Sequence, residues 1–107
     1  MYPKLTSEEI IHLQNSPNKL YTRFYVILYE KSPNTGFAFI ASKKVGNAVV
    51  RNQSKRYLRE YIRLNQHAII KKNILIICKK NILNALNKGA KYSEFEKDLH
   101  NALKKIS

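Results

Sequence analysis

Cationic side chains are the residues of this sequence best suited to a chemical task, and they gather in residues 42–63 (SKKVGNAVVRNQSKRYLREYIR). Arginine and lysine bind phosphate groups, and the arginine fork can contact two phosphate oxygens at once or stack on a base. The start of a helix also exposes free N–H groups that attract anions. The residues that we expect to contact a polyanion are Lys43, Lys44, Asn47, Arg51, Asn52, Lys55, Arg56, Arg59 and Arg63.

No comparable group of residues suggests a protein active site. The histidines His12, His67 and His100 are scattered without metal-ligand spacing, and Cys78 is the single cysteine. We find no Ser/His/Asp or Cys/His grouping, and the acidic residues do not form a two-metal cluster. We therefore expect no catalytic residue, no metal site and no cofactor bound by the protein alone.

The formal net charge is +13, from 20 Lys+Arg and 7 Asp+Glu. Between Lys31 and Tyr92 there are 14 basic residues and one acidic residue, Glu60. Such an excess in a folded domain is typical of binding to nucleic acid or to an anionic membrane surface. The alternative explanation for the lysines is an AT-rich genome, which encodes lysine-rich proteins. It accounts poorly for the arginine cluster, because that bias disfavours arginine.

The 107 residues predict a single domain that spans the chain, residues 1–107. No apolar run approaches the roughly 20 residues of a membrane-spanning helix, and the opening MYPKLTSEEI does not resemble a secretory signal. The lone Cys78 lies in the apolar run ILIIC, which indicates a buried thiol in a reducing compartment. We therefore expect a cytoplasmic protein with no membrane partner.

A long helix must position the basic residues, capped by Asn47 and running to about Gln66. At about 100° per residue, one side of this helix is mostly apolar and should pack on a sheet. That side contains Val50, Ser54, Tyr57, Leu58, Tyr61 and Ile62, while Asn52, Lys55, Arg56, Arg59 and Arg63 lie opposite, with Arg51 at the boundary. Like charges at these spacings destabilise an isolated helix by a few tenths of a kcal/mol per pair, so a binding ridge explains them better than a merely solvated face.

Shorter elements surround this helix. Thr6 and Glu9 fit a capping box for a first helix, on which Ile10, Leu13 and Gln14 should face inward. Ser93 and Glu96 fit another for a last helix, whose apolar residues fall on one stripe at helical spacing, namely Phe95, Leu99, Ala102, Leu103 and Ile106. Strands are predicted at residues 21–29 and 37–42, which would form a hairpin, with a short strand at 19–21 and a buried strand at 73–79. Residues 81–88 could be a short helix or a loop. This order predicts an α+β sandwich, with helices packed on a mostly antiparallel sheet.

The segment SKKVGNAVVRNQSKRYLRE closely resembles the signature of the bacterial ribonuclease P protein subunit, which reads roughly S-K-K-x-G-N-A-V-x-R-N-R-x-K-R-x-x-R. The matching positions are Ser42, Lys43, Lys44, Gly46, Asn47, Ala48, Val49, Arg51, Asn52, Lys55, Arg56 and Arg59. The match is consecutive, and the resemblance covers nearly the whole chain, though weakly before Tyr21.

The resemblance implies an αβββαβα order on a four-stranded, mostly antiparallel sheet, of the kind found in the second domain of a ribosomal protein. It also implies a left-handed crossover, where general rules predict a right-handed one. The implied function is to bind the catalytic RNA of ribonuclease P and to assist removal of the 5′ leader from precursor tRNA. The implied chemistry belongs to the RNA and Mg²⁺, and the leader would lie between the first helix and the sheet.

Two departures from the family pattern bear on these sites. Gln53 replaces the third arginine of the signature, and Arg63 could partly compensate for that lost charge. Lys4 is the only basic residue before the first helix, where related proteins carry several. In that helix, Ile10 and Gln14 occupy the positions at which relatives have leader-contacting phenylalanines.

The predicted strand at 21–29 could supply aromatic contacts to the leader instead. Alternation places Arg23, Tyr25, Ile27 and Tyr29 on one face. Tyrosines on that face could stack on unpaired bases, or they could equally pack into the core. Phe24, Val26 and Leu28 share the other face, which looks more like the core.

Two other functions remain open at this point. One is a non-catalytic RNA-binding protein, such as a ribosomal component. The other is DNA binding by the basic helix, which we do not expect because no companion helix-turn-helix unit is apparent and the helix offers little base-reading chemistry.

Overall fold

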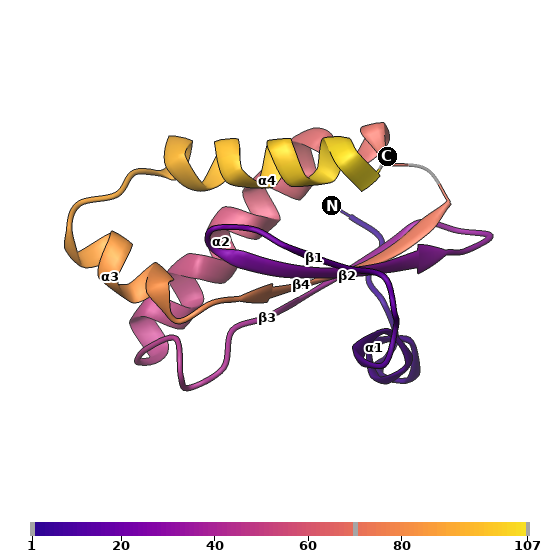
Figure 1. The fold of residues 1–107 in the computed structure, drawn as a ribbon, viewed down its shortest axis with the longest axis horizontal. Coiled ribbons are helices and arrows are strands. Elements are labelled where there is room, and N and C mark those ends of the chain that lie inside the picture. Colours follow the sequence, from indigo (N-terminus) through magenta and orange to yellow (C-terminus); the bar gives the residue numbers. More distant parts are fainter. Residues whose placement is uncertain (1, 70, 107) are drawn as a thin grey trace.

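A computed structural model describes residues 2–69 and 71–106. The elements along the chain are α1 (Ser7–Gln14), β1 (Lys19–Tyr21), β2 (Tyr25–Lys31), β3 (Gly36–Ile40), α2 (Ala48–Asn65), a short 3₁₀ turn (Gln66–Ala68), β4 (Lys72–Cys78), α3 (Asn81–Asn87) and α4 (Tyr92–Ile106). α4 lies along one face of the sheet and α1 crosses the opposite face (Figure 1). The predicted α+β fold with a four-stranded sheet is confirmed, and the ambiguous segment after β4 forms a helix.

The strand order in the sheet is β1-β2-β4-β3. β4 therefore lies between β2 and β3, and the hairpin predicted from those two strands is wrong. The reason is that Ile74, Leu75 and Ile76 at the middle of β4 are all 0% exposed. A strand buried on both faces belongs in the interior of a sheet. β4 pairs antiparallel with β2 and parallel with β3, and α2 makes the β3–β4 crossover, whose left-handed sense stays a prediction.

The two faces of β2 pack against different layers. Tyr25 and Ile27 are both 0% exposed and belong to the main core under α2 and α4. Val26 and Leu28 face the other way, into a smaller cluster with Leu13 of α1. Of the residues expected on the firmer core face, Phe24 is buried in the main core as expected. Val26 and Leu28 lie on the other face, so for them the expectation is wrong, because the larger helical layer covers the face of Tyr25.

α1 is short but well anchored. The Thr6 hydroxyl accepts a hydrogen bond from the Glu9 N–H (3.2 Å), and the Glu9 carboxylate accepts one from the Thr6 N–H (2.9 Å), which confirms the capping box. These bonds lower the pKa of Glu9. The same carboxylate also accepts a hydrogen bond from the Asn73 amide of β4 at 3.2 Å. Leu13 is buried as predicted, whereas Gln14 is exposed.

α2 is held at its start and along one side. The Asn47 side chain accepts a hydrogen bond from the Val50 N–H at 3.0 Å, as predicted for a cap. Ser54, Leu58, Tyr61 and Ile62 are buried against the sheet and α4. This packing determines which side of α2 faces outward.

α4 begins at Tyr92, two residues earlier than a cap at Ser93 would allow. The Lys91 N–H donates to the Glu94 carboxylate (3.0 Å), and Ser93 lies inside the first turn, so the predicted Ser93–Glu96 capping box is wrong. The predicted apolar stripe is confirmed, since Phe95, Leu99, Ala102, Leu103 and Ile106 are all buried.

Cys78, at the end of β4, is a buried thiol as predicted, and burial raises its pKa to about 12.

Two leucines of α2 test this packing. Replacing Leu58, which is 0% exposed, with Ala should lower the free energy of unfolding by about 2–5 kcal/mol, because the substitution leaves a cavity. Leu64 is 57% exposed, so Leu64→Ala should change that free energy by less than about 0.5 kcal/mol. Chemical denaturation followed by circular dichroism measures both. Equal losses would contradict the orientation of α2.

Candidate nucleic-acid interface

The bend between β3 and α2 presents two lysines beside the helix start. Lys43 and Lys44 are exposed, while the neighbouring Val45 is 1% exposed and anchors the bend in the core. Gly46 has φ +153°, and a Cβ built there would lie 3.1 Å from the Val50 Cβ. A side chain at this position is therefore disfavoured both by the backbone conformation and by the space available. The glycine lets the two ammonium groups stand next to the N-terminus of α2.

The outward residues of α2 line two different grooves, one on each side of the helix. Lys55 and Arg59 line a groove on the β3 side, which we call the α1 groove. Asn52 and Arg56 line a groove on the α4 side, which we call the α4 groove. The α1 groove is lined by Tyr2, Lys4, Leu5, Ile10, Phe37, Ala38, Phe39, Lys55 and Arg59. The α4 groove is lined by Val49, Asn52, Gln53, Arg56, Tyr57, Glu60 and Tyr92.

The N-terminal segment forms one wall of the α1 groove. The Leu5 N–H donates to the Phe37 carbonyl (3.0 Å), and the Phe37 N–H donates to the Pro3 carbonyl (2.9 Å), so this segment runs beside β3. The Tyr2 ring packs on Phe39 with 5.2 Å between ring centres. Lys4, the only basic side chain before the first helix, thus lines the same groove as Lys55 and Arg59.

Two arginines of α2 are less available than predicted. The Arg63 guanidinium lies 2.7 Å from the Glu60 carboxylate, and this contact lowers the pKa of Glu60 and raises that of Arg63. That Arg63 partly compensates for the charge missing at Gln53 stays a prediction. Arg51 is half-buried, and its Nε has no hydrogen-bond partner within residues 2–69 and 71–106.

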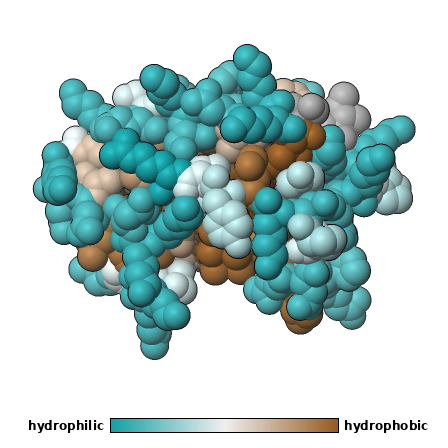
Figure 2. Space-filling model, viewed as in Figure 1, coloured by the Kyte–Doolittle hydropathy of each residue, from teal (hydrophilic) through white to brown (hydrophobic). Residues whose placement is uncertain are grey.

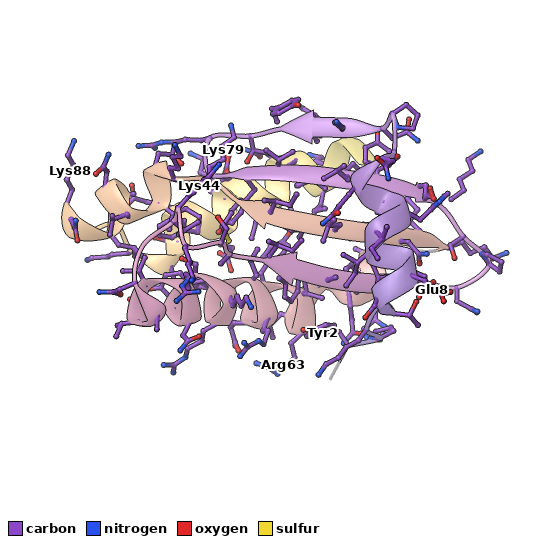
Figure 3. The ribbon with its side chains drawn as sticks, turned by 90° about the horizontal axis from the view of Figure 1, so that it is seen from below. Tyr2, Glu8, Lys44, Arg63, Lys79 and Lys88 are labelled. Atoms are coloured by element: carbon purple, nitrogen blue, oxygen red, sulfur yellow. The ribbon has the colours of Figure 1, made fainter. Side chains whose placement is uncertain are left out.

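The face of the sheet beneath α1 carries an open strip of side chains. The register of the strands puts Tyr21, Val26, Ile77 and Ile40 in one cross-strand row. α1 covers the next row through Leu13 and leaves this row half-buried, with Tyr21 66% exposed. Figure 3 shows this face, with α1 across one end of the strands and Lys44 and Lys79 toward the other end.

The three residues predicted to contact a leader differ in how exposed they are. Tyr25 is 0% exposed, and burial raises its pKa, so its predicted stacking on bases is wrong. Tyr29 is half-buried and packs against the same core. Arg23 is exposed at the bend before β2, with its guanidinium 4.7 Å from the centre of the Phe24 ring.

Tyr21 is the aromatic residue that sequence reasoning missed. It belongs to β1 and not to the strand of Tyr25, so the alternation predicted for one strand at 21–29 does not apply to it. The bend at residues 22–24 separates the two strands and changes the parity. The Lys79 ammonium lies 5.8 Å from the centre of the Tyr21 ring, which adds a cation beside the exposed aromatic.

Asp98 of α4 holds that bend. Its carboxylate accepts hydrogen bonds from the Thr22 hydroxyl (2.7 Å), the Arg23 N–H (3.2 Å) and the Phe24 N–H (3.0 Å). The Lys79 ammonium also donates to the Thr22 carbonyl. A residue far along the chain thus holds the bend at which β1 ends, and the bond from Lys79 to Thr22 places its ammonium beside Tyr21.

Neighbouring surface is mostly polar. Figure 2 shows hydrophilic side chains over most of the face seen there, with apolar surface visible between them. Among the residues that the structure describes, no three His, Cys, Asp or Glu side chains gather in a way that could hold a metal ion. None of the described helices is long and apolar enough to span a bilayer.

The anchoring role of Asp98 can be measured directly. Asp98→Ala should lower the free energy of unfolding by roughly 1.5–3 kcal/mol, since hydrogen bonds to an ionised group are lost. It should also speed amide hydrogen exchange at Arg23 and Phe24. Lys97→Ala, at an exposed position on the same helix, serves as the control. Unchanged exchange at both amides would show that Asp98 does not hold the bend.

Comparison with known proteins agrees with this geometry. A family model for ribonuclease P matches residues 5–107. A ribonuclease P protein component from Fusobacterium nucleatum is 39% identical over 90% of this chain and 88% of its own length. Another from Mycoplasma mycoides is 32% identical over 92% of this chain and 87% of its own length.

Solved structures share the fold at lower identity. The ribonuclease P protein of Thermotoga maritima superposes with a TM-score of 0.86 at 23% identity, covering 97% of both chains. That of Staphylococcus aureus superposes with a TM-score of 0.84 at 21% identity, covering 100% of this chain and 96% of its own. The predicted fold class is thereby confirmed. With the family model matching nearly every residue and close relatives sharing the name, this chain belongs to the ribonuclease P protein family.

Proposed function

We propose that this chain binds the catalytic RNA of ribonuclease P through α2 and the 5′ leader of precursor tRNA through the sheet face beneath α1. The main support for the proposal is that the signature residues divide between the surface and the core. Its cations Lys43, Lys44, Arg56 and Arg59 are exposed, while Leu58 in the middle of the same helix is 0% exposed. The signature residues thus form an RNA-facing surface whose orientation is determined by the core.

The α1 groove has the chemistry of a phosphate track. Lys4, Lys55 and Arg59 project into it, and no carboxylate is found among its described lining residues. Each phosphate that such cations neutralise releases counterions, so the affinity for RNA should fall steeply as salt rises. The exposed Lys43 and Lys44 extend this basic surface to the N-terminus of α2.

The strip beneath α1 has the chemistry of a single-stranded site. Val26, Ile77 and Ile40 offer half-buried apolar surface, and the exposed Tyr21 can stack on an unpaired base. Base–aromatic stacking contributes roughly 1–3 kcal/mol per base and tolerates any sequence. Lys79 beside the ring supplies a cation for the adjoining phosphate. These properties suit a leader, which varies in sequence among precursor tRNAs.

The protein's part in the reaction is binding and placement. Among the described residues, no three His, Cys, Asp or Glu side chains cluster as metal ligands. We propose that Mg²⁺ is held by the RNA, which supplies the hydrolytic chemistry. The side chains of this protein bring the two RNAs together and offset the repulsion between their phosphates.

Reconstitution tests the proposal. The chain combined with its ribonuclease P RNA should cleave precursor tRNA at a Mg²⁺ concentration where the RNA alone is slow, because the protein's cations replace part of the screening by the metal. Single-turnover cleavage rates measure the effect. Cleavage that the protein leaves unchanged at every salt and Mg²⁺ concentration would rule the proposal out.

A pair of variants makes the same experiment specific for α2. Arg59→Ala should flatten the slope of log affinity against log salt by about one unit, because one phosphate contact is lost. Lys88→Ala removes an equally exposed charge from the end of α3 and should leave the slope unchanged. Equal slopes for the two variants would show that only net charge matters.

The leader site has its own test. Tyr21→Ala should weaken binding of precursor tRNA with a long leader by roughly 5- to 150-fold, the equivalent of about 1–3 kcal/mol. Precursor with a one-nucleotide leader should bind unchanged. Tyr25→Phe, which alters only a buried hydroxyl, should bind both precursors normally. A loss that is equal for both leader lengths would remove Tyr21 from the leader site.

A further inference from the structure

The two grooves that flank α2 differ in charge although they share one helix. The described lining of the α1 groove contains three cations and no acid. The α4 groove contains one cation, Arg56, and one acid, Glu60, together with the neutral amides of Asn52 and Gln53. Its remaining lining is apolar or aromatic, provided by Val49, Tyr57 and Tyr92. Only the first of these grooves is suited to a run of phosphates.

We propose that the α4 groove binds one unpaired nucleobase of the partner RNA, and that it prefers a base whose exocyclic amino group lies next to an unprotonated ring nitrogen, which is adenine or cytosine. The inference rests on the proposed function, since it takes RNA as the partner, but it assigns a second kind of contact to α2. Protein recognition of RNA sequence mostly uses such splayed-out bases, which stack on aromatic rings and present their edges to polar side chains.

An aromatic cluster forms one wall of the α4 groove. The Tyr57 and Tyr92 ring centres are 5.5 Å apart, and those of Tyr57 and Phe95 are 5.4 Å apart. Phe95 is 1% exposed and fixes the cluster to the core. Tyr57 and Tyr92 are each half-buried and keep part of their surface in the groove. A base entering here would gain contact with rings that are already ordered.

The polar groups of the groove match a base edge. The Gln53 amide donates to the Tyr57 hydroxyl at 2.9 Å. This bond holds the side chain in place and leaves its carbonyl oxygen and its second N–H for a ligand. A carboxamide can pair with adenine through one donor and one acceptor. Gln53 occupies the position where the signature has an arginine, so a group that would favour phosphate is replaced by one that can read a base.

The charge of Glu60 makes the groove better suited to a base than to a phosphate. Its carboxylate would repel a phosphate placed in the groove, whereas it can accept a hydrogen bond from the amino group of cytosine or adenine. The Arg63 guanidinium, 2.7 Å away, keeps the carboxylate ionised and in position. Uracil has no exocyclic amino group, which is the source of the predicted preference.

The rim of the groove connects it to the rest of the basic surface. Arg56 is exposed beside the groove and can bind the phosphate of the nucleotide whose base enters it. Val49 is 72% exposed at the rim, and contact with a base would cover it.

The experiment uses a tryptophan reporter. The chain contains no tryptophan, so Val49→Trp creates a single one at the rim without disturbing buried residues. Leu64→Trp, at a position 57% exposed on the same helix and outside the groove, is the matched control. Both variants of the full chain are titrated with single-stranded hexamers of adenosine, cytidine or uridine, and with an RNA duplex of equal phosphate number.

The adenosine and cytidine hexamers should quench the Val49→Trp fluorescence saturably. The uridine hexamer and the duplex should need concentrations about tenfold higher, the equivalent of one lost base-edge contact. Adding Glu60→Ala should reduce this preference while strengthening binding of all four RNAs. Gln53→Ala, at an exposed position, should reduce the adenosine preference in fluorescence-anisotropy titrations of labelled hexamers with the otherwise unaltered protein.

Three results would overturn the inference. They are the absence of quenching, equal quenching by duplex and single strands, and equal quenching in the Leu64→Trp control. Cleavage by the reconstituted RNA–protein pair is measured alongside. If reconstitution stimulates cleavage while the reporter shows no base preference, the base site is disproved and the proposed function stands. If reconstitution also fails, the fault lies with the proposed function.

Discussion

The burial of β4 on both of its faces is the constraint on which the rest of this structure depends. Ile74, Leu75 and Ile76 are all 0% exposed, so β4 requires a strand on each side and a helical layer above and below. β2 and β3 supply the strands, and the parallel pairing with β3 makes α2 the crossover. α2 and α4 then cover one face and α1 covers part of the other. Both candidate RNA surfaces result from this arrangement.

The orientation of α2 follows from its place in that layer. Ser54, Leu58, Tyr61 and Ile62 must face the core, and this leaves the cations on the outer side. Repulsion among them costs a few tenths of a kcal/mol per pair, whereas burying one leucine contributes roughly 1.5–3 kcal/mol. The free energy gained by packing therefore exceeds the cost of repulsion, and α2 stays folded with its cations close together on one side.

The divided chemistry of α2 comes from what stands on each side of it. Toward β3, the N-terminal segment brings Lys4 beside Lys55 and Arg59 and makes a cationic groove. Toward α4, the aromatic cluster of Tyr57, Tyr92 and Phe95 meets neutral amides and Glu60. One helix thus offers a track for phosphates on one side and a less charged hollow on the other. Sequence periodicity alone could not distinguish these two sides, because their walls are made by other elements.

By itself, the sequence determined the features that depend on local chemistry. The Asn47 cap, the Thr6–Glu9 capping box and the apolar stripe of α4 were predictable, because each depends on residues within one or two turns. The outward cations of α2 were predictable for the same reason, and the consecutive signature residues indicated the family.

Tertiary structure alone decided the features that depend on long-range pairing. β4 inserts between β2 and β3 because its burial requires it, and no local signal opposed the hairpin predicted there. Asp98, more than seventy residues away, bonds the bend after β1. That bend reverses the parity between Tyr21 and Tyr25, so Tyr25 enters the core while Tyr21 lies exposed on the sheet face beneath α1. A shift of one residue in a strand exchanges its two faces, which is why the sequence identified an aromatic strand but not the tyrosine that is exposed.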